Sequence, residues 1–141
     1  MSTAKINREQ MEDYLGRFGV SYHSPIYITM TDLSGFLASN KNVRWGYAAL
    51  SDDNNTLFVV VMSLLSIVAE NTVTFHTISR SDVQSMHFSR ILLSKAYNTD
   101  IKFTEDGKKK RFKIIIGANA KKELEDQEIN SQNMLDILRT W

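Results

Sequence analysis

Three histidines are the residues of this chain best suited by type to metal binding or acid–base chemistry: His23, His76 and His87. None of them has an H-x-x-x-H, H-x-H or H-E-x-x-H spacing, which would place two metal ligands on one face of a helix or strand. His76 and His87 would approach each other if residues 73–78 and 83–88 paired as a hairpin, but the sequence offers no recognisable third ligand. We therefore expect surface or hydrogen-bonded histidines.

Other reactive groups are equally sparse. The sequence contains no G-x-S-x-G elbow, no Walker-type phosphate loop and no G-x-G-x-x-G fingerprint. It has no cysteine, which excludes disulfides, thiolate metal ligands and cysteine nucleophiles and suits a reducing cytoplasm. We predict no catalytic residue, no metal and no cofactor, and a cytoplasmic protein.

No segment of the sequence has the pattern of a membrane or targeting element. Residues 1–9 are mostly polar and lack the apolar core of a signal peptide. The longest apolar run, residues 57–69, is shorter than the roughly 20 residues of a transmembrane helix. Its β-branched stretch Val59-Val60-Val61 favours a buried strand over an interfacial segment.

The one concentrated charge feature is basic and lies near the C-terminal end. The net charge is only +1, but positive residues gather in residues 108–113, and Lys102 joins them across an expected hairpin. Alternation along a strand places Lys109, Arg111 and Lys113 on the face opposite the apolar side chains. The candidate binding surface for an anionic partner consists of four residues: Lys102, Lys109, Arg111 and Lys113.

This basic stripe can be interpreted in two ways, as a feature that keeps the hairpin soluble or as a binding surface. Lysines on a hairpin often serve only to keep it soluble and to prevent edge-to-edge association. As a contact surface, the stripe would suit an anionic lipid surface, an acidic protein patch or a nucleic-acid backbone. Nucleic acid is disfavoured, because Phe103 and Phe112 belong to the apolar face and cannot serve as stacking platforms among the charges.

A β-hairpin positions the stripe. Residues 97–103 alternate, with Tyr97, Thr99, Ile101 and Phe103 on one face. A second alternating run follows at residues 112–116. Asp106-Gly107 between them supplies the positive φ angles of a tight type I′ turn.

The rest of the chain reads as a β-rich α+β protein with a helix near each end. Met11, Tyr14, Leu15 and Phe18 recur at helical spacing, and Asn7 with Gln10 resembles a capping box. Further strands are expected at residues 26–28, 44–51, 56–62, 73–78 and 83–88. The last helix is expected to begin at Asn130 or Ser131 and to carry an apolar stripe of five residues: Met134, Leu135, Ile137, Leu138 and Trp141.

The chain is expected to form a single domain over residues 1–141. Residues 39–42 form the only candidate hinge, which would separate an N-terminal helical extension, residues 1–42, from a β-rich body, residues 43–141. Residues 31–40 are ambiguous between a short helix and a loop. The large aromatic residues are expected to form one core cluster closed by the last helix: Trp45, Phe58, Phe75, Phe103, Phe112 and Trp141.

The body resembles bacterial pleckstrin-homology-like domains. Three segments carry the resemblance: residues 78–83 (ISRSDV), residues 112–116 (FKIII) and the last helix to Trp141. The resemblance implies a bent antiparallel sheet, barrel-like, with a C-terminal helix plugging one end, and a noncatalytic interaction module. In some relatives the first strand-turn-strand binds phosphoinositides, but here that turn is Asp52-Asp53-Asn54-Asn55, which would repel phosphate.

The sequence is consistent with two functions. The first is a noncatalytic binding or assembly module whose partner is a protein, including a second copy of this chain in a homo-oligomer, or an anionic surface. The alternative is a cone-shaped α+β domain that binds a small ligand or acts as an enzyme. A large enclosed apolar pocket would favour the alternative, whereas a filled barrel would favour the module.

Overall fold

The computed structural model describes residues 7–34, 43–62, 73–117 and 124–141. Within these residues, two α-helices flank seven strands, and a 3-10 turn, η1 (Arg80–Asp82), lies between the fourth and fifth strands. The helices are α1 (Arg8–Gly16) and α2 (Gln127–Leu138), and the strands are β1 (Tyr22–Asp32), β2 (Val43–Ser51), β3 (Thr56–Met62), β4 (Val73–Ser79), β5 (Val83–Arg90), β6 (Tyr97–Glu105) and β7 (Lys108–Ile116).

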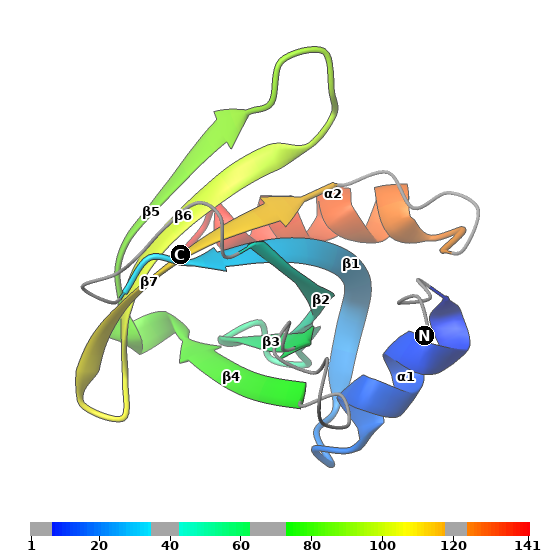
Figure 1. The fold of residues 1–141 in the computed structure, drawn as a ribbon, viewed down its shortest axis with the longest axis horizontal. Coiled ribbons are helices and arrows are strands. Elements are labelled where there is room, and N and C mark those ends of the chain that lie inside the picture. Colours follow the sequence, from blue (N-terminus) through cyan, green and yellow to red (C-terminus); the bar gives the residue numbers. More distant parts are fainter. Residues whose placement is uncertain (1–6, 35–42, 63–72, 118–123) are drawn as a thin grey trace.

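The strands form one antiparallel sheet in the order β4-β3-β2-β1-β7-β6-β5, and the sheet curls into a half-barrel (Figure 1). The α+β, β-rich fold class expected from the sequence is confirmed. β1 lies in the middle of the sheet, between β2 and β7. Residues 22–32 are therefore part of the sheet rather than of a helical extension, and the hinge at residues 39–42 lies outside the described residues.

Residues 73–78 do not pair with residues 83–88, which was the condition for His76 and His87 to approach each other. β4 and β5 stand at opposite ends of the strand order, although only η1 separates them along the chain. The turn at Arg80–Asp82 connects β4, at one end of the strand order, to β5, at the other end. β4 therefore pairs with β3, and β5 pairs with β6. His76 and His87 consequently lie on strands that do not pair.

The hairpin of β6 and β7 forms as expected. Glu105 pairs with Lys108, and the two turn residues have positive φ angles, 52° at Asp106 and 76° at Gly107. These angles are those of a type I′ turn, whose twist matches that of the flanking strands. The register is thereby fixed, and Ile101, Phe103, Phe112 and Ile114 are all fully buried.

The apolar side chains of the described residues form two core clusters, one on each side of the sheet. On the concave side, residues from β1, β2, β3, β4, β6 and β7 pack around Met134, Leu135 and Leu138 of α2. On the convex side, Met11, Tyr14 and Leu15 of α1 pack on β2 and β3. β3 is buried on both faces, which explains its unbroken apolar sequence.

The single aromatic cluster expected from the sequence is therefore divided. Phe103, Phe112 and Trp141 belong to the concave cluster, while Trp45 and Phe75 belong to the cluster under α1. The sheet lies between the two groups because successive side chains of a strand point to opposite faces.

Gly46 shows how tightly β2 and β3 approach each other. A Cβ atom at this position would lie 1.8 Å from the backbone oxygen of Val60 and 2.9 Å from Cα of Val61. Both obstructing groups are backbone and cannot swing aside. Only glycine fits at this point of β2.

Helix α1 begins as expected at Asn7, whose Oδ1 accepts a hydrogen bond from the Gln10 N–H at 2.7 Å. The side-chain amide of Gln10 donates to the Tyr14 hydroxyl instead of reaching back to Asn7. The helix therefore has a plain N-cap in place of the expected capping box.

Helix α2 begins at Gln127, three residues before the earlier of the two expected caps. Asn130 and Ser131 lie inside the helix. The expected apolar stripe packs on the concave cluster, although Ile137 and Trp141 are only partly buried. The Trp141 Nε1–H donates to the backbone oxygen of Asn54 at 3.0 Å, which ties the C-terminal end to the β2–β3 turn.

Gln127 occupies a gap in the sheet. β7 pairs with β1 only from Thr29 to Asp32, which leaves the N-terminal half of β1 without a strand on that edge. The buried Gln127 amide fills this place: its Oε1 accepts from the Tyr27 N–H at 2.8 Å and its Nε2–H donates to the Tyr27 oxygen at 2.9 Å. One side chain thus makes the two hydrogen bonds that a neighbouring strand would make.

The next residues of β1 are adapted to the same edge. The Pro25 oxygen accepts from Nδ2 of Asn130 at 3.1 Å, and proline has no N–H that would need a partner there. Ser24 has a positive φ of 53°, and the register of β1 with β2 shifts between His23 and Ile26. Nδ2 of Asn133 donates to the Ser24 hydroxyl at 2.6 Å, so α2 follows the strand along this irregular stretch.

We predict that Gln127→Ala destabilises the protein. The substitution removes the partners of the part-buried N–H and C=O of Tyr27, and the free energy of unfolding should fall by about 1–3 kcal/mol in a denaturant titration. Gln132→Ala is the matched control, because Gln132 is an exposed residue of the same helix that bonds only to Asp136 among the described contacts. Equal stability of the two variants would contradict the role given to Gln127.

Candidate functional site

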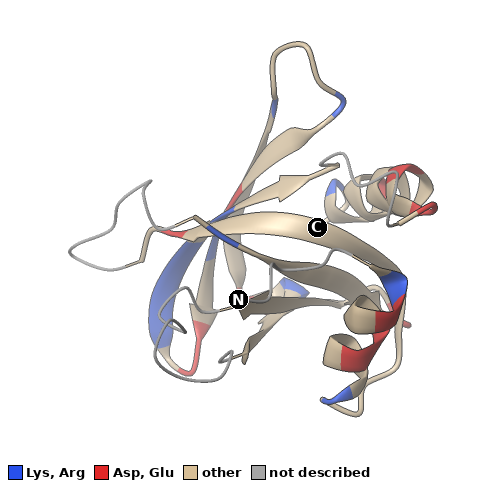
Figure 2. Ribbon diagram, turned by 45° about the vertical axis from the view of Figure 1, so that its right-hand side comes forward, with Lys and Arg blue, Asp and Glu red and all other residues tan. Residues whose placement is uncertain are grey.

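The four basic residues expected to form a stripe lie together on the convex side of β6 and β7. The strand register places Lys102 opposite Arg111, Thr104 opposite Lys109 and Asp100 opposite Lys113. Lys102, Lys109 and Arg111 are exposed and Lys113 is half-buried. We call these four residues the basic face. Figure 2 shows the concentration of Lys and Arg along this hairpin, away from the acidic α1.

One acidic residue interrupts the basic face. The Asp100 carboxylate accepts two hydrogen bonds from Arg111, at 3.0 Å from Nε and 2.6 Å from Nη2. This bond to Arg111 holds the pKa of Asp100 below its ordinary value, and the charges of Arg111, Lys102 and His87 add to the effect. The same interaction raises the pKa of Arg111. Arg111 is thus engaged within the sheet, and Lys102, Lys109 and Lys113 carry the available charge.

The sequence pattern placed Asp100 on this face but did not reveal the ion pair. The hairpin register sets Asp100 opposite Lys113, two residues from Arg111, so Asp100 and Arg111 are diagonal neighbours on the same face of the two strands. Diagonal neighbours are within reach of a long side chain such as arginine. Once the turn is located at Asp106-Gly107, this register is the signal that could have identified the pair.

A second polar cluster, which the sequence did not indicate, joins β4 to β6 where the sheet curls back on itself. The His76 Nδ1 lies 3.1 Å from Oε1 and 3.2 Å from Oε2 of Glu105, and the Lys110 ammonium lies 3.6 Å from the same carboxylate. The His76 ring also meets Phe112 edge-on, with ring centroids 4.8 Å apart. A hollow of about 430 Å³ opens beside His76 and Glu105, lined also by Asp82 and Thr104.

The other two histidines have separate surroundings. His23 bonds to the Ser24 hydroxyl and to Oδ1 of Asn54, and His87 is exposed on β5. His23 and His76 are hydrogen-bonded, as expected. Within residues 7–34, 43–62, 73–117 and 124–141, no three His, Cys, Asp or Glu side chains come together in a way that could hold a metal ion.

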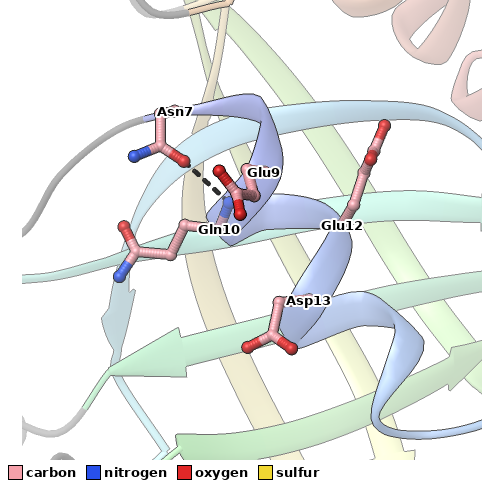
Figure 3. Close-up of a pocket in the computed structure, with 5 residues that line it drawn as sticks. All are labelled: Asn7, Glu9, Gln10, Glu12 and Asp13. Carbon is pink, nitrogen blue, oxygen red and sulfur yellow. Dashed lines mark hydrogen bonds between the residues drawn. The ribbon is translucent and has the colours of Figure 1, made fainter.

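An acidic depression lies over α1 and is lined by Asn7, Glu9, Gln10, Glu12 and Asp13 (Figure 3). Its carboxylates point in different directions rather than toward one point. Glu12 pairs with Arg8 at 3.2 Å and Asp13 with Arg17 at 2.9 Å, each one helical turn away. These are exposed pairs along the helix, and the carboxylates do not converge on a common ligand position.

The concave side of the sheet is occupied by side chains. On the other side of the sheet, Tyr47 is fully buried under α1, and burial raises its pKa to about 12. Trp45 packs against it edge-on, with ring centroids 5.9 Å apart. Between the sheet and α2, Phe103, Phe112 and Met134 are all fully buried. Among the described residues, a buried apolar cluster thus occupies the space between the sheet and α2.

Comparison with protein-family models, with curated proteins and with solved structures finds no match to this chain. No helix in the described part of the chain is long and apolar enough to span a membrane.

The Asp100–Arg111 pair predicts a pH dependence of stability. Because the pKa of Asp100 is lowered in the folded protein, its ionised form stabilises the fold above the ordinary pKa of 3.8, and this contribution disappears as the pH falls through the lowered value. Asp100→Asn and Arg111→Gln should both flatten the acid end of a plot of unfolding free energy against pH, measured by urea titration. The double variant should add nothing further, since either change removes the pair. Single variants that keep the wild-type slope would refute this assignment.

Proposed function

We propose that this chain is a noncatalytic binding module that engages an anionic partner through the basic face. The observation that carries the proposal is the position of Lys102, Lys109 and Lys113 on the convex side of the sheet, opposite the filled concave core. Their charges are held side by side on a rigid hairpin of fixed register. Such an array attracts an anionic surface and needs no pocket.

The resemblance to bacterial pleckstrin-homology-like domains supports a module over an enzyme. A curled antiparallel sheet with a C-terminal helix packed on its concave side is the arrangement that this resemblance implies. The filled interior also favours the module over the cone-shaped alternative, which would need an enclosed pocket for a ligand. The proposal places the module in the cytoplasm, which a chain without cysteine suits.

The β2–β3 turn is not the anion site in this proposal. Hydrogen bonds from the Ser51 hydroxyl and the Asn55 N–H lower the pKa of Asp53, which keeps its carboxylate ionised. A negative charge in the turn repels phosphate. The basic face lies on a different hairpin, at the other arm of the sheet.

A heparin column, used as a sulfated polyanion probe, tests the basic face. We expect Lys102→Glu/Lys109→Glu to elute at a clearly lower salt concentration than the wild type, because fewer cations meet the polyanion. Arg8→Glu/Arg17→Glu is the control, since it makes the same change of net charge at exposed positions of α1.

Comparing the elution of the two variants distinguishes binding by a local surface from an effect of net charge. An earlier elution of the Lys102→Glu/Lys109→Glu protein than of the control supports the basic face. If both variants shift equally, only net charge matters and the proposed surface is wrong.

A further inference from the structure

The turn between β5 and β6 exposes two neighbouring leucines. Leu92 is 87% exposed and Leu93 is 99% exposed. They lie in the connection between β5 and β6. The hairpin of these two strands extends away from the rest of the sheet (Figure 1). Isolated exposed apolar residues are common on soluble proteins, but an adjacent, almost completely exposed pair on a protruding tip presents a continuous apolar surface.

Hydrogen bonds hold this tip in a defined shape. The Ile91 N–H donates to the Ala96 oxygen at 2.9 Å, and the Ser94 N–H donates to the Ile91 oxygen at 3.1 Å. The second bond makes Leu92 and Leu93 the two central residues of a β-turn. The backbone of the tip therefore has a defined, hydrogen-bonded conformation.

The backbone at Leu93 is unusual for a leucine. Its φ is 62°, at the turn position where glycine or asparagine is normally found. A leucine in this conformation is less favourable than either of them. Its exposure means that its side chain gains no packing inside the domain in return.

Basic residues flank the two leucines. Arg90 is exposed, and its Nε–H donates to the Ser94 oxygen at 3.2 Å. The Lys95 side chain is 79% exposed and its ammonium lies 2.8 Å from the Glu128 carboxylate of α2. An ion pair this exposed is weak, so an anionic surface can compete with Glu128 for Lys95.

We propose that this tip docks on the surface of an anionic lipid bilayer. Leu92 and Leu93 enter the interfacial region, while Arg90 and Lys95 contact acidic headgroups. Apolar side chains with basic neighbours match a surface whose charge lies outside an apolar interior. A second copy of the chain fits less well, because two such tips would bring like charges together. With only two leucines inserted, the binding is reversible.

This inference goes beyond the basic face. The tip lies at the Tyr97 end of β6, whereas Lys109 pairs with Thr104 near the opposite end of that strand. Neither surface requires the other. A variant of one surface therefore leaves the other available for measurement.

Vesicle sedimentation tests the tip directly. We expect the wild type to sediment with vesicles of phosphatidylcholine and phosphatidylserine and much less with phosphatidylcholine alone. Leu92→Ser/Leu93→Ser should weaken binding about tenfold or more, because the inserted apolar area is lost. Val43→Ser, at another exposed apolar residue, is the control and should bind as the wild type does.

A second variant separates binding from stability. Leu93→Asn should keep or raise the melting temperature, because asparagine tolerates the positive φ and no packing is removed. Its binding to the phosphatidylserine vesicles should nevertheless fall. A stable Leu93→Asn protein that binds as well as the wild type would overturn the inference.

Insertion can be followed at the tip itself. The chain has no cysteine, so Leu93→Cys provides one attachment point for an environment-sensitive dye. The dye emission should rise with phosphatidylserine vesicles, whereas the same dye at Ser81→Cys, an exposed position on η1, should not respond. No response at position 93 would overturn the inference.

Three further outcomes would overturn the proposed role of the tip. Binding that is lost in Lys102→Glu/Lys109→Glu but kept in Leu92→Ser/Leu93→Ser would overturn the tip and leave the basic face standing. A wild type that does not sediment would also overturn the tip. So would gel filtration that shows a dimer broken by the leucine substitutions, since it would assign the leucines to self-association. The serine variant should elute from heparin as the wild type does.

Discussion

The side-chain amide of Gln127 completes the sheet at the point where β7 leaves β1. Its two hydrogen bonds to the backbone of Tyr27 connect α2 to the central strand across 100 positions of sequence. A buried strand edge without such partners would carry a large free-energy cost. This contact fixes the start of α2 on β1, while hydrogen bonds from Asn130 and Asn133 and the packing of the concave cluster hold the rest of the helix.

The two surfaces that we propose for binding lie outside this packed region. Met134, Leu135 and Leu138 are buried on the concave side, whereas the basic face and the leucine tip lie on exposed parts of the sheet. Both belong to the arm of the sheet formed by β5, β6 and β7. The other arm carries α1 on its convex side, where Leu15 and Tyr47 are fully buried.

Features that depend on neighbouring residues could be predicted from the sequence, and features that depend on distant contacts could not. Asp106-Gly107 fixed its hairpin locally, and the alternation around it located the basic face. The start of α2 was placed too late, because local capping preferences cannot show that Gln127 is needed at Tyr27. Consecutive strands usually pair, so the sequence did not show that β4 and β5, on either side of Arg80–Asp82, lie at opposite ends of the strand order. The contact of His76 with Glu105 follows from the curl of the sheet, which no local pattern reveals.

Hydrogen exchange at the Tyr27 amide, followed residue by residue with NMR, tests the central claim most directly. If Gln127 replaces the missing strand, the Tyr27 N–H should exchange as slowly as that of Ile28, which pairs with Gly46 in β2. An amide on an open strand edge exchanges far faster than one in the ladder. Fast exchange at Tyr27 beside slow exchange at Ile28 would show that α2 does not close this edge, and the account of a filled half-barrel acting through its outer surfaces would fail.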